Sequence, residues 1–243
     1  MKKIVVKYKH VISLGWFCSV AEEMEKLGLR NASYPFDWIL SDLKTVYDMI
    51  KGQCIDYLDA EQLVQDDNVK NIYYHRNRKC LAFIHDINPY QDYNKEIEKA
   101  EKKYSRRLER LRHDMKEPCI FLRYIMDNEE YQTVFEKRKE IVNWVKSYHS
   151  ENQIIFIANE DFGKNEEIWS VRKDSDDSVA RQFMMQLPDL KEWLLKQEYD
   201  FSISDNRKWY KRKQRKRALY KYPNKILNKW RQLLFILKTF GHN

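Results

Sequence analysis

The chain has 243 residues, of which 43% are hydrophobic and 14% aromatic, while glycine and proline occur only 5 times each. This composition is typical of a globular protein and excludes a disordered or fibrous chain. A chain of this length buries about 70% of the surface that it exposes when unfolded, so its core needs neither disulfides nor a structural metal. We therefore expect one globular domain with a short appendage.

The charges are unevenly distributed along the chain. The sequence has 45 Lys and Arg against 37 Asp and Glu, which gives a net charge of +8. Residues 206–243 contain 13 of the basic residues and no acidic residue, so the rest of the chain is mildly acidic. This asymmetry predicts a domain over 1–205 and a basic tail over 206–243 that meets an anionic surface.

Short apolar runs of the buried-strand type alternate with helical patterns of apolar residues. We expect strands at 11–14, 72–74, 80–84, 119–122, 154–157 and 201–204. We expect helices near 17–28, 41–51, 92–115, 129–148 and 188–197. The polar segment 159–187 is predicted to be a long loop with a helix at its end. The alternation predicts an α/β domain with a mostly parallel central sheet and helices on both faces, a three-layer Rossmann-like arrangement.

The segment around Cys18 joins a strand to a helix. The apolar run 11–14 ends at Gly15, and Gly28 is the expected stop of the helix that follows. Cys18 thus falls in the first helical turn, where the helix dipole and unpaired N–H groups stabilise a thiolate. Because open α/β sheets bind ligands at this end of a strand, we interpret Cys18 as a candidate nucleophile. The alternative is that Cys18 is a small buried residue that only fills space in the core. Ser13 and Gly15, in the same segment, are candidate substrate-binding residues.

A nucleophilic cysteine needs a general base, and His85 is the best-placed histidine. It follows the apolar run 80–84, so it lies at the carboxyl edge of a strand, where Cys18 is also expected. A histidine that merely caps this strand is the alternative. Asn88, which follows shortly after, is a candidate to orient the His85 ring.

The aromatic segment 33–39 contains one carboxylate, Asp37. Burying this group costs free energy unless it is paired or accepts hydrogen bonds. Asp37 is therefore a candidate to orient His85 or a substrate group, and Trp38 beside it is a candidate substrate-binding residue. The alternative is a carboxylate that caps a helix near Ser41.

Three arginines fall on one face of the helix predicted near 92–115, namely Arg106, Arg107 and Arg110. Arg123 lies at the end of the next predicted strand. Guanidinium groups that converge on the sheet edge would bind a carboxylate or phosphate through paired hydrogen bonds, which predicts an anionic substrate. The alternative is a solvated helix face on which neighbouring glutamates pair with the arginines.

The sequence offers no metal or cofactor motif. Its four cysteines, at 18, 54, 80 and 119, form no C-x-x-C pair, and no two potential ligands have the short spacing of a zinc site. We therefore expect neither a metal nor a cofactor. No long apolar run or signal-type segment opens the chain, which favours a reducing cytoplasm.

The predicted basic tail has two parts. Residues 207–217 form a polybasic block that contains Trp209 and Tyr210. Pro223 is predicted to open a helix with an apolar stripe formed by Ile226, Leu227, Trp230, Leu233, Leu234 and Leu237. A basic amphipathic helix of this kind binds peripherally to an anionic membrane, here the inner face of the cell membrane, without spanning it. Nucleic acid is the second candidate partner, and packing against the body or a partner helix is the third.

Several of these segments together resemble one protein family. They are Ser13-Leu14-Gly15 with Cys18 and Ala21, the block from Gly28 to Ile39 with Pro35-Phe36-Asp37-Trp38, His85-Asp86, and Lys103 to Arg110 before Phe121-Leu122-Arg123-Tyr124. The pattern is similar to that of papain-like cysteine peptidases of bacteria, a domain of unknown function, over roughly residues 10–160. The resemblance implies a Cys–His site at Cys18 and His85.

The resemblance also implies a reaction. It is thiol-dependent hydrolysis or acyl transfer through a thioester, on a peptide, acyl or anionic substrate. Unlike papain, the chain has no Gln over 11–17, so backbone N–H groups around Phe17 to Ser19 are the expected oxyanion donors. The strand-turn-helix order favours an α/β fold, and a papain-like α+β fold is the alternative. The residue that orients His85 stays open among Asp37, Asn88, Asp127 and Asn159.

A protein of a different class is the second interpretation. In it, the chain is a noncatalytic or glycan-related binding protein of a surface-polysaccharide pathway. The arginines then hold an anionic ligand, and Cys18 is a packing residue.

Overall fold

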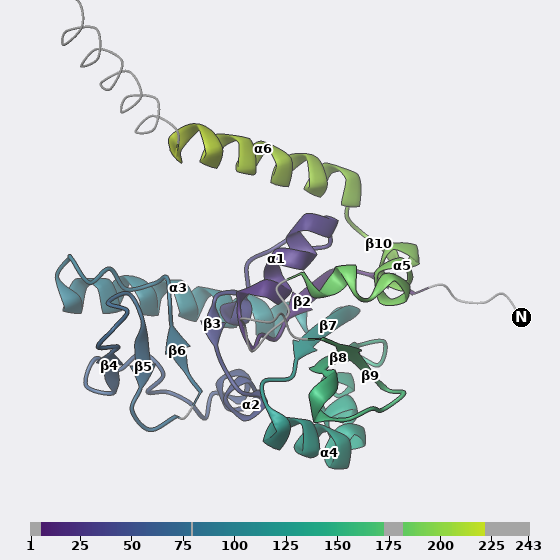
Figure 1. Ribbon diagram of the computed structural model, residues 1–243, viewed down its shortest axis with the longest axis horizontal. Coiled ribbons are helices and arrows are strands. Elements are labelled where there is room, and N and C mark those ends of the chain that lie inside the picture. The colour runs from purple at the N-terminus through teal and green to yellow at the C-terminus, as the bar shows by residue number, and fades with distance from the viewer. Residues whose placement is uncertain (1–5, 79, 173–181, 222–243) are drawn as a thin grey trace, which may run out of the picture.

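The structure is a computed structural model that describes residues 6–78, 80–172 and 182–221. Its helices are α1 (Cys18–Leu27), α2 (Leu43–Lys51), α3 (Tyr93–Asp114), α4 (Asn128–Lys146), α5 (Pro188–Lys196) and α6 (Ile203–Lys221), with short 3-10 helices η1 (Pro35–Asp37), η2 (Glu160–Phe162) and η3 (Phe183–Met185). Its strands are β1 (Lys7–Tyr8), β2 (His10–Ser13), β3 (Ile39–Leu40), β4 (Leu63–Gln65), β5 (Tyr73–His75), β6 (Ala82–Phe83), β7 (Cys119–Tyr124), β8 (Gln153–Asn159), β9 (Ile168–Val171) and β10 (Glu198–Tyr199) (Figure 1). The helix predicted to begin at Pro223 lies outside the described residues.

The strands form a parallel sheet, an antiparallel sheet and a separate pair. The parallel sheet has the order β2-β7-β8-β9, and β1 pairs with β10, also in parallel. The antiparallel sheet has the order β3-β6-β5-β4. The expected mixed α/β class is confirmed. However, the strands expected at 72–74 and 80–84 belong to the antiparallel sheet, because the turn between them is too short for a parallel crossover.

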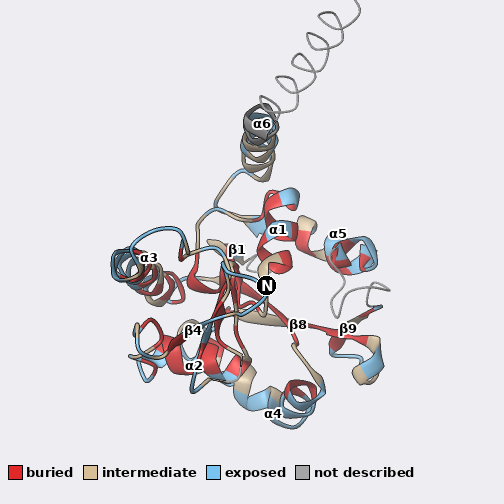
Figure 2. Cartoon of the chain, turned by 60° about the vertical axis from the view of Figure 1, so that its left-hand side comes forward, coloured by how far each residue is buried: buried red, intermediate tan, exposed pale blue. Residues whose placement is uncertain are grey.

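Helices cover both faces of the parallel sheet. Its inner strand β7 is buried at every residue, as a strand covered on two sides must be. Ile120, Leu122 and Tyr124 pack in a cluster with residues of α1 and α5. Cys119 and Phe121 pack on the other face with residues of α2 and α3. In Figure 2, α1 and α5 lie above the strands, and α2 and α4 lie below them. The finer assignment to a three-layer Rossmann-like class, with a papain-like fold as alternative, stays a prediction.

Apolar periodicity predicted most elements correctly, and two expectations were wrong. The helices expected near 17–28, 41–51, 92–115, 129–148 and 188–197 correspond to α1 to α5. Residues 201–204 are not a strand, because the Ser202 hydroxyl accepts a hydrogen bond from the Asp205 N–H and α6 begins at Ile203. The predicted loop over 159–187 contains the strand β9, which pairs with β8 at Phe156 and Ile168.

The helix α6 crosses the predicted boundary between residues 205 and 206. The division into a domain and a tail stays a prediction. In the part of the chain that the structure describes, no helix is both long and apolar enough to cross a bilayer.

A buried ion pair joins the parallel sheet to its surroundings. Arg123, at 0% exposure, donates from Nε and Nη2 to the two carboxylate oxygens of Glu130, both at 2.7 Å. Its Nη1 donates to the Leu14 carbonyl at 2.7 Å, and Nη2 also donates to the Ser41 carbonyl at 2.8 Å. These contacts connect β7, α4, the end of β2 and the start of α2. Because both charges are paired and hydrogen-bonded, their burial is tolerated.

We predict that Glu130→Gln lowers the free energy of unfolding by about 3–5 kcal/mol, because it leaves the Arg123 charge buried without a carboxylate. The matched control is Glu160→Gln, which breaks the exposed ion pair with Arg172 at 3.1 Å. The control is expected to cost about 1 kcal/mol or less. Urea denaturation followed by circular dichroism measures both, and equal losses in the two variants would contradict this role of the buried pair.

Candidate active site

The Cys18 turn is built as the sequence predicts. After β2, Gly15 adopts a left-handed conformation with φ of 83°, and α1 begins at Cys18. The Gly15 carbonyl accepts a hydrogen bond from the Tyr124 N–H at 3.0 Å, and the Trp16 carbonyl accepts one from the Ser41 N–H at 3.1 Å. Cys18 is half-buried and is the first residue of its helix, at the carboxyl end of β2.

The start of α1 is electrostatically suited to a thiolate. Phe17, the residue before the helix, supplies no side-chain acceptor to the first-turn N–H groups, and that turn contains no acidic residue. The N–H groups and the helix dipole therefore favour negative charge at Cys18. The same N–H groups are the donors expected for an oxyanion.

Ser13 and Gly15 serve the structure of this turn. Ser13 is fully buried, and its hydroxyl accepts the Gly15 N–H at 3.2 Å. A Cβ atom at Gly15 would lie 3.0 Å from the Ser41 hydroxyl and 3.3 Å from the Arg123 Nη1 atom. The predicted contacts of Ser13 and Gly15 with substrate stay predictions.

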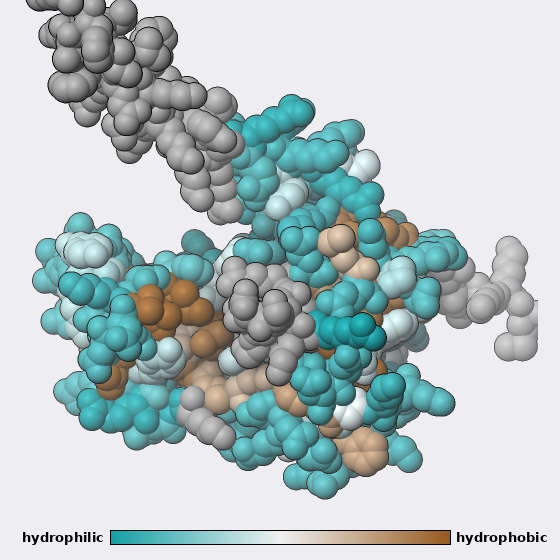
Figure 3. Space-filling view, in the orientation of Figure 1, coloured by the Kyte–Doolittle hydropathy of each residue, from teal (hydrophilic) through white to brown (hydrophobic). Residues whose placement is uncertain are grey.

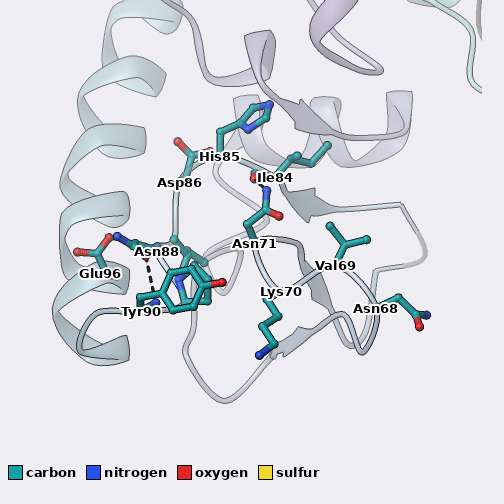
Figure 4. Close-up of a pocket in the computed structure, with 12 residues that line it drawn as sticks. Asn68, Val69, Lys70, Asn71, Ile84, His85, Asp86, Asn88, Tyr90 and Glu96 are labelled. Carbon is teal, nitrogen blue, oxygen red and sulfur yellow. Dashed lines mark hydrogen bonds between the residues drawn. The ribbon is translucent and has the colours of Figure 1, made fainter. Parts of the chain in front are cut away.

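His85 lies in the loop that follows β6 of the antiparallel sheet, two residues after the strand ends. It is exposed, and its ring meets the Trp38 ring edge-on, with 6.4 Å between centroids. Figure 4 shows this ring at one end of a groove, pointing away from Lys70 and Tyr90. The groove has a volume of about 840 Å³ and is lined by Asn68, Val69, Lys70, Asn71, Ile84, His85, Asp86, Ile87, Asn88, Pro89, Tyr90 and Glu96.

The structure brings His85 and Asn88 into one groove, but Cys18 is not among its lining residues. Cys18 follows a strand of the parallel sheet, whereas His85 follows a strand of the antiparallel sheet. Asn88 accepts a hydrogen bond from the Tyr90 N–H at 3.0 Å, and its own N–H donates to Glu96 at 3.2 Å. Neither contact involves the His85 ring.

Asp86 anchors the His85 loop to α3, which sequence reasoning missed. Its carboxylate pairs with Lys103 and accepts a hydrogen bond from the Tyr104 hydroxyl at 2.7 Å. Tyr104 is completely buried, and burial together with the Asp86 charge raises the pKa of its hydroxyl well above the usual value. The signal in the sequence is the acidic residue next to His85, together with Tyr104 on the apolar face of the predicted helix.

Asp37 is held by groups other than His85. It is 1% exposed, pairs with Arg30 and accepts the Tyr34 N–H at 2.9 Å. Burial raises the pKa of this carboxyl, and the Arg30 charge and the Tyr34 N–H oppose that rise. The expectation that a buried Asp37 must be paired is confirmed. It caps η1, whereas the helix after Ser41 is capped by Asp42.

Trp38 lies between two sequence-predicted groups. The Arg30 guanidinium is 5.8 Å from the centroid of its ring, and His85 meets the ring from another side. Trp38 is half-buried. It therefore links the Arg30–Asp37 pair to the His85 loop.

The four arginines do not form one anion site. The prediction that Arg123 binds substrate is wrong, because its guanidinium is buried and donates to Glu130 and two backbone carbonyls. Arg110 donates to the Ser33 carbonyl at 2.9 Å, and Arg107 lies 5.6 Å from the centroid of the Tyr104 ring. Arg106 is exposed. Arg107, Arg110 and Arg123 thus contact three different groups and do not share one ligand site.

No group of three His, Cys, Asp or Glu side chains suited to a metal ion occurs within residues 6–78, 80–172 and 182–221.

Comparison with known proteins gives two matches. A family model described as putative papain-like cysteine peptidase (DUF1796) matches residues 9–163, which include Cys18 and His85. The uncharacterized protein R408 of Acanthamoeba polyphaga mimivirus is 31% identical over an alignment of 93 residues, and the match covers 31% of this chain and 42% of that protein. The chain thus spans less than half the length of this relative. No solved structure matches. The expected bacterial source stays a prediction.

We predict that Gly15→Ala destabilises the protein by at least about 2 kcal/mol, because it adds a steric contact to the cost of a left-handed alanine. The matched control is Gly52→Ala, whose φ is 75° and whose Cβ would lie 3.6 Å from its nearest neighbour, the Arg112 side chain. The control should lose only about 1 kcal/mol. Thermal unfolding measures both variants, and a Gly15→Ala loss no larger than that of the control would contradict the crowding at this turn.

We predict that two buried thiols react slowly with iodoacetamide. Burial raises the pKa of Cys54 to about 11 and raises that of Cys119 as well. Because only the thiolate reacts, labelling of Cys54 at pH 8 should be at least about 100-fold slower than in the urea-unfolded chain, and should accelerate as the pH approaches 11. Peptide mass spectrometry measures these rates. Rapid labelling of either thiol in the folded protein would contradict its burial.

Proposed function

Because the chain belongs to the family of putative papain-like cysteine peptidases, we propose that it is a thiol-dependent hydrolase or acyl transferase. Cys18 is the nucleophile and His85 is the general base. The substrate is a peptide or another acyl compound.

The position of Cys18 is the observation that carries this proposal. The thiol is half-buried at the first residue of α1, at the carboxyl end of a parallel strand, and the side chain of Phe17 before the helix does not cap it. This position lowers the free energy of a thiolate and offers N–H donors to the oxyanion that its attack creates. A cysteine that only fills space in a core needs none of these features.

The proposed reaction has two steps. His85 takes the proton of the Cys18 thiol, and the sulfur bonds to the acyl carbon of the substrate. The bond from that carbon to the leaving nitrogen or oxygen breaks, and the imidazolium gives its proton to the leaving group. Water then cleaves the thioester and regenerates the thiol, or an acceptor nucleophile does so in acyl transfer.

The proposal requires the His85 side chain to turn from Trp38 toward Cys18 in the complex with substrate. His85 is exposed, and the ion pair that anchors its loop to α3 is made by the neighbouring Asp86 and not by the His85 ring. Catalytic hydrogen bonds commonly form only when substrate is bound. Asp37 and Asn88 stay the candidates to orient the ring, and each must exchange a present partner to do so.

The alternative of a noncatalytic anion-binding protein is not favoured by the described residues. It needs arginines that converge on one site, but Arg123 is buried in an ion pair and Arg110 holds a backbone carbonyl. The predicted cytoplasmic location is part of the proposal, because a reducing compartment keeps the thiol active.

The test is the pH dependence of iodoacetamide labelling at Cys18 in the wild type and in His85→Ala. We expect an apparent pKa below about 8.5 in the wild type, and at least about tenfold slower labelling at pH 7 in His85→Ala. The matched control is His113→Ala, which removes a histidine whose side chain is 81% exposed on α3. This control should label like the wild type.

Two outcomes would overturn the proposed site. If Cys18 stays unreactive until the protein unfolds, it is a packing residue. If Cys18 reacts rapidly and His85→Ala labels at the same rate, His85 is not its base.

A further inference from the structure

One side of α6 contacts the C-terminal end of α1 through hydrogen bonds and an ion pair. The Arg207 Nε donates to the Leu27 carbonyl at 2.7 Å, and the Asn206 amide donates to the Gly28 carbonyl at 3.1 Å. Lys213 pairs with Glu25, which is nearly buried. The first two contacts satisfy carbonyl groups at the C-terminus of α1, where the positive charge of Arg207 is favoured. The side of α6 that carries Asn206, Arg207 and Lys213 therefore faces α1.

The other side of α6 carries a basic face, which we define as Lys211, Arg212, Arg215 and Lys216. These residues are spaced i, i+1, i+4 and i+5, so they share one side of the helix. All four are exposed, and within the described part of the chain none of them forms an ion pair with an acidic side chain. Lys208, one turn earlier, pairs with Asp205 at 3.0 Å and is not part of this face.

The basic face is presented away from the rest of the protein. Figure 1 and Figure 2 show α6 projecting beyond α1, with both four-stranded sheets on the far side of α1. The surface of α6 is hydrophilic in Figure 3. Trp209, at 55% exposure, stands next to it with the Lys213 ammonium 4.8 Å from the centroid of its ring. Four exposed cations on one side of a projecting helix favour an extended anionic partner.

We propose that the basic face of α6 binds the surface of an anionic phospholipid bilayer. Its charge is complementary to such a surface, and each cation held close to it strengthens binding about fivefold. The sequence after α6 favours lipid over nucleic acid, because it carries six apolar residues at helical spacing, from Ile226 to Leu237. A leucine-rich stripe has no role in contacts with phosphates and bases. This proposal is independent of the reaction at Cys18.

The test is sedimentation of the full-length protein with vesicles of phosphatidylcholine alone or with about 30% phosphatidylglycerol. The test variant carries Lys211→Gln, Arg212→Gln, Arg215→Gln and Lys216→Gln. The matched control removes the same number of charges from exposed lysines elsewhere, by Lys116→Gln, Lys137→Gln, Lys139→Gln and Lys146→Gln. A labelled single-stranded oligonucleotide is titrated in parallel.

We expect the wild type and the control to bind the anionic vesicles only, and to be released by about 0.5 M salt. The test variant should bind at least about 100-fold more weakly. Equal binding of the test variant and the wild type would overturn the proposal, as would equal losses in both variants. Binding of the oligonucleotide without binding of anionic vesicles would also overturn it and would assign the face to nucleic acid.

Discussion

The buried pair of Arg123 and Glu130 is the interaction on which the arrangement of this protein depends. A guanidinium at 0% exposure is stable only if its donors are satisfied, and here a carboxylate from α4 and the carbonyls of Leu14 and Ser41 satisfy them. The two carbonyls belong to the segments that lead into α1 and α2. The ion pair therefore fixes where the parallel sheet meets the antiparallel one, and the Arg123 Nη1 atom, with the Ser41 hydroxyl, crowds the position of a Cβ atom at Gly15.

The proposed site lies where these two sheets meet. Cys18 follows a strand of the parallel sheet, whereas His85 follows a strand of the antiparallel sheet. The Ser41 N–H donates a backbone hydrogen bond to the Trp16 carbonyl. Because Ser41 directly follows β3 and Trp16 lies in the Cys18 turn, this bond connects β3 to that turn. Trp38 lies before the same strand β3 and contacts His85. One short strand thus carries contacts to both halves of the site, so the packing that forms the core also sets the separation of thiol and imidazole.

Local features of the site were predictable from the sequence, and long-range ones were not. Apolar spacing and Gly28 predicted the helix that begins at Cys18, because both signals lie within one segment. The role of Arg123 was mispredicted, because the sequence around an arginine at the end of a strand does not show whether its side chain faces solvent or a buried carboxylate. Here that carboxylate is Glu130, seven residues later. Asp37 was correctly expected to be paired, but its partner Arg30 was not identified. The separation of Cys18 and His85 depends on how two sheets pack, which no local pattern encodes.

The contact between α1 and α6 has a consequence for the order in which the protein is completed during synthesis. The last carbonyls of the helix that carries Cys18 accept hydrogen bonds from Asn206 and Arg207, and the latter lies 180 residues further along the chain. The strand β1 likewise pairs with β10, which lies far along the chain. When a ribosome has made the first two thirds of the chain, Cys18 and His85 have both been synthesised. The carbonyls of Leu27 and Gly28 still lack their hydrogen-bond donors at that stage. The helix that carries Cys18 therefore gains its last hydrogen bonds only when Asn206 and Arg207 have emerged from the ribosome.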